Sequence, residues 1–224
     1  MKRIAGLFIS MLLTLMTIVS CDSAQQRAEN PFFSEWDTPY GVPPFDKIRP
    51  EHYMPAFERG MTLQLAEIDA ITSNNDEPTF ENVVLAYDNS GKMLAQTALV
   101  FGMLSEADNN SEMQALQEQA MPLLAAHADR IRLDEKLFEK VKAVYDRRAS
   151  LGLDAEQMRL LQKTYDGFVR AGALLDKEQK ERLKAINEEL SLAAVKFGNN
   201  LLAENNGFVM ELDKDQLDGL PMGV

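Results

Sequence analysis

Residues 153–206 read LDAEQMRLLQKTYDGFVRAGALLDKEQKERLKAINEELSLAAVKFGNNLLAENN, and this stretch decides the fold class. Each half opens with an aspartate that is followed three residues later by a glutamine, as Asp154 with Gln157 and Asp176 with Gln179. This spacing is that of a capping box, in which the two side chains bind free backbone N–H groups at a helix start. We therefore expect two consecutive helices, and the short connection between them predicts that they run antiparallel.

Apolar residues recur at steps of three and four through both predicted helices, which places them on one face of each helix. In the first helix this face comprises Met158, Leu161, Tyr165, Phe168, Val169 and Gly172. In the second helix it comprises Leu183, Ile186, Leu190, Ala193, Ala194, Phe197 and Leu201. We expect both faces to be buried, so the preceding chain has to supply the rest of the core.

Four segments upstream carry the same helical periodicity. Their predicted starts are Pro50, Thr79, Ser111 and Asp134. These residue types are favoured at helix starts, and Ser111 with Gln114 has the form of a further capping box. The sequence therefore predicts an all-α fold, an array of about six helices in antiparallel hairpins.

Both ends of the predicted array are irregular. Residues 30–50 contain five prolines and a glycine, which exclude a regular helix and predict an extended arm. The arm also carries five aromatic residues, more than a disordered linker usually has, so we expect it to lie in a groove of the helical body. An exposed aromatic strip for a partner is the alternative. After residue 206, residues 208–212 have the pattern of a short strand, and residues 207–224 are interpreted as the truncated start of a following segment.

The first 20 residues have the features of a bacterial lipoprotein signal peptide. Lys2 and Arg3 precede an apolar run that has the length of a secretory signal core rather than of a membrane-spanning helix. The run ends in a lipobox pattern at residues 18–21, whose cysteine becomes the acylated first residue after cleavage. Cys21 is the only cysteine of the chain, so it cannot form an intramolecular disulfide.

Cys21 is therefore the predicted lipidation site, with a buried structural thiol as the alternative. Residues 21–29 are polar and predict a flexible tether between the lipid anchor and the lobe at residues 30–206. Acyl chains on one cysteine hold a protein on a membrane surface without a spanning segment. We expect an exported protein, lipid-anchored in the bacterial cell envelope as a periplasmic or outer-membrane lipoprotein.

Charge and motif content narrow the range of functions. The formal net charge of −12 repels phosphate backbones, and no basic run is present, so nucleic-acid binding is not expected. The chain has no His-Glu-x-x-His, no Gly-x-Ser-x-Gly and no phosphate-binding loop. Its two histidines, His52 and His127, have no ligand-type neighbours at metal-binding spacing, and we expect each to be half-buried and bonded to a backbone carbonyl. No catalytic or metal residue is therefore predicted, and the substrate-binding residues are not identified.

Short motifs follow one another along residues 30–221 in an informative order. They read NPF at 30–32, TPYGVPPFDKI at 38–48, PEHY at 50–53, PTFEN at 78–82, DAEQMRLL at 154–161, FVRAGA at 168–173 and KAINEEL at 184–190. In order and spacing they resemble the amino-terminal part of the bacterial peptidyl-dipeptidases, which are thimet-oligopeptidase-like zinc metallopeptidases. The resemblance implies a nearly all-helical enzyme whose deep channel admits short peptides.

In that family the zinc ligands and the catalytic glutamate lie in the carboxy-terminal part, beyond the stretch that this chain resembles. We therefore hypothesise that the chain is the membrane-tethered amino-terminal lobe of such an enzyme, which forms one wall of the channel and is inactive alone. It would bind no cofactor itself, and its partners would be the missing catalytic part, with its zinc, and short peptides. The alternatives are a stand-alone helical lipoprotein that binds a peptide or protein partner, and a nonfunctional remnant that tends to aggregate.

Overall fold

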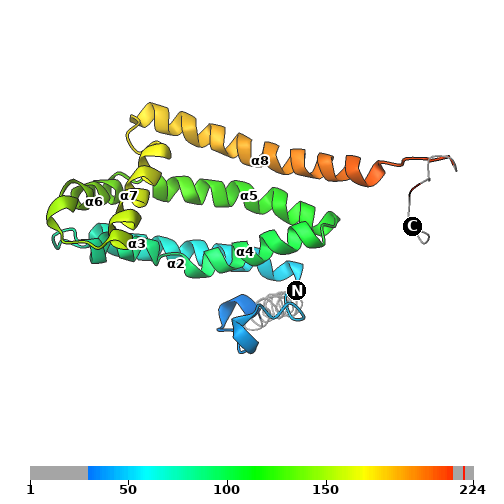
Figure 1. The fold of residues 1–224 in the computed structure, drawn as a ribbon, viewed down its shortest axis with the longest axis horizontal. Helices are drawn as coiled ribbons and strands as arrows, with labels where there is room; N and C mark the ends of the chain where they lie inside the picture. Colours follow the sequence, from blue (N-terminus) through cyan, green and yellow to red (C-terminus); the bar gives the residue numbers. More distant parts are fainter. Residues whose placement is uncertain (1–29, 214–218, 220–224) are drawn as a thin grey trace, which may run out of the picture.

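A computed structural model describes residues 30–213 and residue 219. Within these residues the regular structure is helical and no β-strand forms, which confirms the all-α prediction (Figure 1). The long helices are α2 (Tyr53–Ser73), α4 (Lys92–Ala107), α5 (Ser111–Arg132), α6 (Glu135–Asp146), α7 (Ala155–Arg170) and α8 (Lys177–Gly207). The short elements are η1 (Pro31–Phe33), η2 (Pro39–Gly41), η3 (Pro50–His52), η4 (Phe80–Leu85), α3 (Ala86–Asp88) and η5 (Arg148–Ser150).

Two expectations for the ends of the chain have different outcomes. The predicted strand at residues 208–212 is wrong, because the chain has no regular structure from residue 208 to residue 213. The signal peptide, the tether and Cys21 lie outside the described residues. Among the helices of the described part, none is both long enough and apolar enough to cross a membrane.

The capping boxes of the two deciding helices form as predicted. Asp154 accepts a hydrogen bond from the backbone N–H of Gln157 at 2.8 Å, and the Gln157 side chain accepts one from the N–H of Asp154 at 3.1 Å. Asp176 and Gln179 repeat this arrangement at 2.8 and 3.2 Å. Reciprocal bonds of this kind satisfy N–H groups that have no partner within the helix, and they fix the starts of α7 and α8.

The start of α5 differs from the prediction by one residue. Asn110 is the cap, and its side-chain oxygen accepts from the N–H groups of Glu112 and Met113 at 3.1 and 3.0 Å, so Ser111 is the first residue of the helix. Both residue types cap well, and the sequence alone did not distinguish them.

The segment that begins at Thr79 is not one helix. It forms the π-helix η4 and the short α3, and then breaks before α4 at Gly91, which has a φ of +71°. A glycine adopts this left-handed conformation without steric cost. Gly91 also approaches α2 closely, since an added Cβ would lie 2.3 Å from the Gln64 side chain. At Gly102 of α4, by contrast, nothing lies within 4 Å of an added Cβ.

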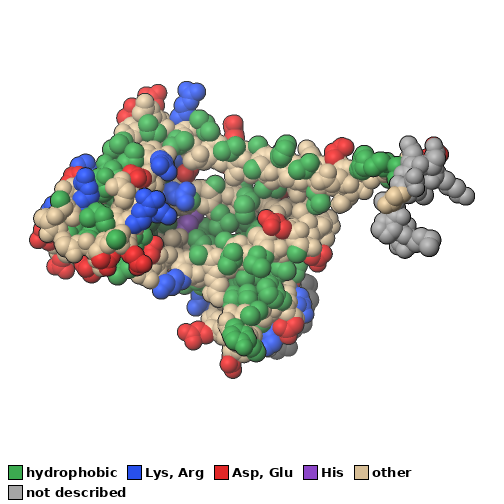
Figure 2. All heavy atoms as spheres, in the orientation of Figure 1, with side chains coloured by type: hydrophobic (Ala, Val, Ile, Leu, Met, Phe, Trp, Pro, Cys, Tyr) green, Lys and Arg blue, Asp and Glu red, His purple; other side chains and the backbone are tan. Residues whose placement is uncertain are grey.

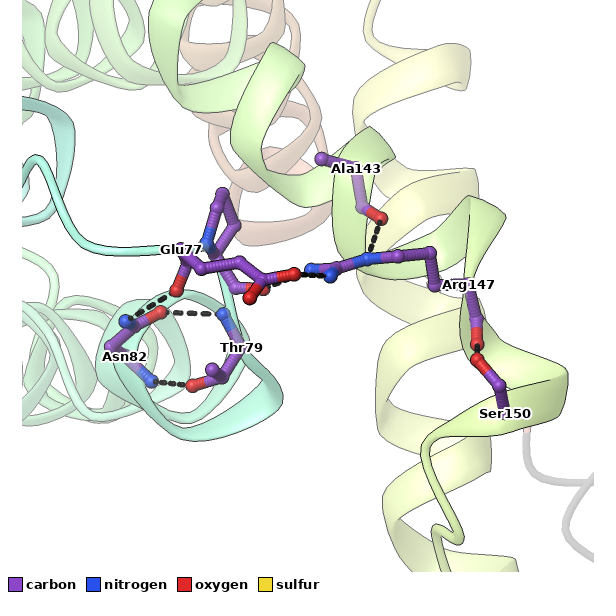
Figure 3. A network of polar contacts seen from close by, with 7 residues as sticks. Glu77, Thr79, Asn82, Ala143, Arg147 and Ser150 are labelled. Carbon is purple, nitrogen blue, oxygen red and sulfur yellow. Dashed lines mark hydrogen bonds and ion pairs between the residues drawn. The ribbon is translucent and has the colours of Figure 1, made fainter.

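A polar network joins the start of η4 to the end of α6 (Figure 3). Arg147 donates to the Glu77 carboxylate and to the backbone carbonyl of Pro78, and its Nε donates to the Ala143 carbonyl at 3.3 Å. Thr79 and Asn82 form a reciprocal cap on the same side, with bonds of 2.7 and 3.1 Å. This network fixes the direction in which the chain enters η4.

The helices α2, α4 and α5 lie side by side, and α6 and α7 cover one end of this group (Figure 1). The helix α8 then returns along α5 in the opposite direction. The expected antiparallel hairpin of α7 with α8 is therefore wrong, because α8 packs on α5 instead. Gly172, with a φ of +95°, lies in the connection where the chain changes direction.

The buried apolar side chains form two clusters. One lies between η4, α6, α7 and the last turns of α2 and α5, and it includes Val84, Leu137, Val141, Leu161 and Phe168. The other lies between the arm, α4 and the first turns of α2 and α5, and it includes Phe32, Tyr53, Phe57, Val100 and Phe101. Neither cluster includes a residue of α8.

The arm packs on the helical body at both of its ends. Phe32 and Ile48 are buried in the second cluster, and the Trp36 indole donates to the Pro31 carbonyl at 2.9 Å. The middle of the arm points into solvent, with Tyr40 and Val42 exposed. The expectation of a docked arm is therefore correct for its ends and wrong for its middle.

Candidate functional site

The most distinctive surface of the molecule belongs to α8, the 31-residue helix that ends the described array. Polar contacts attach its first half to the body. The Asn187 side-chain amide donates to both carboxylate oxygens of Asp129 on α5, at 2.8 and 3.0 Å. The Lys180 ammonium, on the one buried residue of α8, donates to Glu135 at 3.2 Å. These hydrogen bonds help to hold the first half of α8 on the body.

The second half of α8 lies above a groove of about 500 Å³. The groove is lined from α4 and α5 by Ser105, Gln117 and Met121, and from α8 by Ser191, Val195 and Leu202, among others. The lining also includes the carboxylate of Glu106 and the side-chain amides of Asn109 and Asn199. Hydroxyl, amide and aliphatic groups of this kind can hold a polypeptide by hydrogen bonds and apolar contacts.

The predicted apolar face of α8 is exposed except for Leu183, which is half-buried, and this corrects the expectation of burial. We call Ile186, Leu190, Ala193, Phe197 and Leu201 the outer stripe. Four of its side chains have large exposed fractions, 49% for Ile186, 62% for Leu190, 70% for Phe197 and 50% for Leu201. Figure 2 shows apolar side chains spaced along this helix.

The outer stripe was expected to be buried because periodicity identifies residues that share a face of a helix. Periodicity does not say which face of the helix meets the body. At 100° per residue, the outer stripe lies about a third of a turn from the line of Lys180, Asn187, Ser191 and Val195, which faces the helical body.

The two histidines have structural roles that differ from the predicted ones. His52 accepts from the backbone N–H of Arg49 through Nδ1 at 3.0 Å, as part of the cap that precedes α2. His127 is buried, and its Nε2 lies 2.7 Å from the Gln64 side-chain oxygen. Burial, with a smaller effect from the nearby Arg130, lowers the pKa of His127. Within the described residues neither ring is hydrogen-bonded to a backbone carbonyl, so the expected bonds are wrong.

Residues 30–213 and 219 contain no group of three or more histidine, cysteine, aspartate or glutamate side chains that could hold a metal ion. The described residues therefore do not fit a zinc site. No residue was predicted as a metal ligand or as catalytic, and the one predicted modification site, Cys21, lies outside the described range.

Comparison with known proteins identifies the family. No protein-family model matches the chain. The chain is 42% identical over 192 residues to the dipeptidyl carboxypeptidase of Escherichia coli, which covers 85% of this chain and 28% of that protein. It is homologous to the amino-terminal part of the dipeptidyl carboxypeptidases. The dipeptidyl carboxypeptidase of Salmonella typhimurium is 39% identical over 184 residues, 82% of this chain and 27% of that protein.

More distant relatives match a similar share of the chain. The oligopeptidase A of Escherichia coli is 25% identical over 185 residues, 82% of this chain and 27% of that protein. The chain thus spans little more than a quarter of the length of these dipeptidyl carboxypeptidases and oligopeptidases.

Nothing in the sequence had pointed to the outer stripe as an exposed surface, because its residues follow the same pattern as a core helix.

Proposed function

We propose that this chain is the amino-terminal, channel-wall lobe of a zinc metallopeptidase that resembles peptidyl-dipeptidase. The complete enzyme would hydrolyse short peptides and release dipeptides from their carboxy termini. The observation that carries this proposal is the 42% identity to a dipeptidyl carboxypeptidase over 85% of the chain. Because the described residues do not fit a zinc site, zinc and the groups that activate water would come from the remaining part of the enzyme.

Two measurements test this proposal. The isolated chain, supplied with zinc and a short peptide, should release no dipeptide, and chelator-sensitive release would contradict the proposal. In the second measurement, residues 30–213 replace the matching residues of Escherichia coli dipeptidyl carboxypeptidase. This chimera should release dipeptides, because the lobe supplies the same wall of the channel. An inactive chimera that is nevertheless folded would also contradict the proposal.

A binding lipoprotein is the second candidate, and the exposed middle of the arm favours it. Tyr40, Val42 and Phe45 present apolar surface to solvent there. The genomic sequence that follows codon 224 separates the two candidates. A His-Glu-x-x-His motif within the next few hundred codons supports the peptidase, and its absence supports the binding protein.

We also propose that the protein is exported and held in the cell envelope by acyl chains on Cys21. The lipobox pattern at residues 18–21 and the positive charges of Lys2 and Arg3 support this location. The substitution Cys21→Ser should move the protein from the membrane fraction to the soluble fraction of cells that express it. Unchanged fractionation would contradict lipid anchoring.

A further inference from the structure

The outer stripe of α8 is apolar without being part of the core of the described residues. Its four large side chains are about half exposed or more, and neither core cluster includes a residue of this helix. An amphipathic helix on a protein surface normally turns such a stripe inward. Here the hydrogen bond from Asn187 to Asp129 and the contact of Lys180 with Glu135 hold a different side of α8 against the body. The stripe is therefore left available for another element.

The spacing of the stripe describes the element that would fit it. Residues 186, 190, 193, 197 and 201 follow one another at steps of four, three, four and four. Such a repeat forms a seam into which the side chains of a second helix insert. The stripe also lies along a single convex helix and not in a pocket, so its shape suits a helix better than a small ligand.

We propose that the outer stripe is the surface on which the catalytic part of the enzyme docks, through an apolar helix of that part. This inference rests on the proposed function. Its support is the length of the relatives, since residues equivalent to this chain make up only 28% of Escherichia coli dipeptidyl carboxypeptidase. The larger remainder has to pack against this lobe, and α8 is the last helix of the described residues. A second copy of the chain is disfavoured, because each copy carries a formal charge of −12.

The test places the same substitution in the isolated chain and in the chimera described above. Leu190→Glu introduces a carboxylate into the stripe. In the isolated chain Leu190 is 62% exposed, so the unfolding temperature should change by no more than about 2 °C. In the chimera the carboxylate would be buried without a partner, and the unfolding temperature should fall by about 5 °C or more.

The matched control is Leu99→Glu on α4, where the leucine is 66% exposed. This variant should leave the unfolding temperature unchanged in both proteins. An active chimera that tolerates Leu190→Glu, or that loses as much stability through Leu99→Glu, would overturn the docking proposal and leave the proposed function intact. A folded but inactive chimera would instead contradict the proposed function.

Sedimentation of the isolated chain tests the alternative that a second copy of the chain covers the outer stripe. We expect a monomer at micromolar concentrations. A dimer that Leu190→Glu dissociates would assign the stripe to a second copy and overturn the proposal.

Discussion

The Asn187 side chain donates to both carboxylate oxygens of Asp129, at 2.8 and 3.0 Å, and so joins α8 to α5 across 58 residues of sequence. Asp129 is buried, and a buried carboxylate without its hydrogen-bond donors is costly. Because α8 contributes to neither core cluster, this contact has a large share in keeping the helix in place.

Asn187→Ala should therefore loosen α8 selectively. We expect the free energy of opening of this helix to fall by about 1–3 kcal/mol, which hydrogen exchange of the α8 amides would measure. Asn200→Ala is the control, because Asn200 is exposed on the same helix. Equal exchange in the two variants would show that the bonds to Asp129 do not hold the helix.

Two glycines should respond to alanine in opposite ways. A Cβ at Gly60 of α2 would lie 2.9 Å from the backbone of Leu94 on α4, so Gly60→Ala should lower the free energy of unfolding by about 1–3 kcal/mol. A Cβ at Gly102 would meet nothing within 4 Å, and Gly102→Ala should raise it by about 1 kcal/mol through helix propensity. Urea unfolding measures both changes. Changes of the same sign would contradict the close approach of α2 and α4.

Tyr53 is 1% exposed, and its hydroxyl has no hydrogen-bond partner within the described residues. Burial raises the pKa of Tyr53 to about 12. Tyr53→Phe removes an unsatisfied polar atom and should raise the free energy of unfolding by about 1 kcal/mol. The control is Tyr145→Phe, which removes a bond of 3.0 Å to Gln162 and should lower it by a similar amount. Destabilisation by Tyr53→Phe would mean that the hydroxyl has a partner.

His127 should make the fold less stable in mild acid. Burial lowers the pKa of this side chain below 6.5, so on acidification the unfolded state takes up the proton first. The free energy of unfolding therefore falls as the pH drops from 6.5 through the lower pKa of the folded state. His127→Gln does not titrate and can still donate to Gln64. Urea unfolding at about pH 7.5 and about pH 5.5 should show a smaller acid-induced loss for this variant, and an equal loss would contradict the role of His127.

Local chemistry accounts for the parts of the fold that the sequence predicted well. The caps at Asp154 and Asp176 depend on residues three positions away, so the pattern carries nearly all the necessary information. The break at Gly91 and the direction of α8 depend on contacts with distant helices, which no local pattern records. For the same reason, the residues of the outer stripe were correctly predicted to share one helix face, but that face was wrongly predicted to be buried.

The family resemblance was confirmed by the comparisons, whereas the exposure of the outer stripe could be found only in the structure. Exposure of Leu190 and Phe197 is a property of how α8 lies on α5, and both residues would look the same in sequence if they were buried.

The helices α2 and α5 each contribute side chains to both core clusters. Ile71 and Phe57 of α2 lie in different clusters, as do Ile131 and Met113 of α5. Neither cluster can lose its packing without displacing a helix that the other one requires. We therefore expect the two ends of the lobe to unfold together in a single cooperative transition.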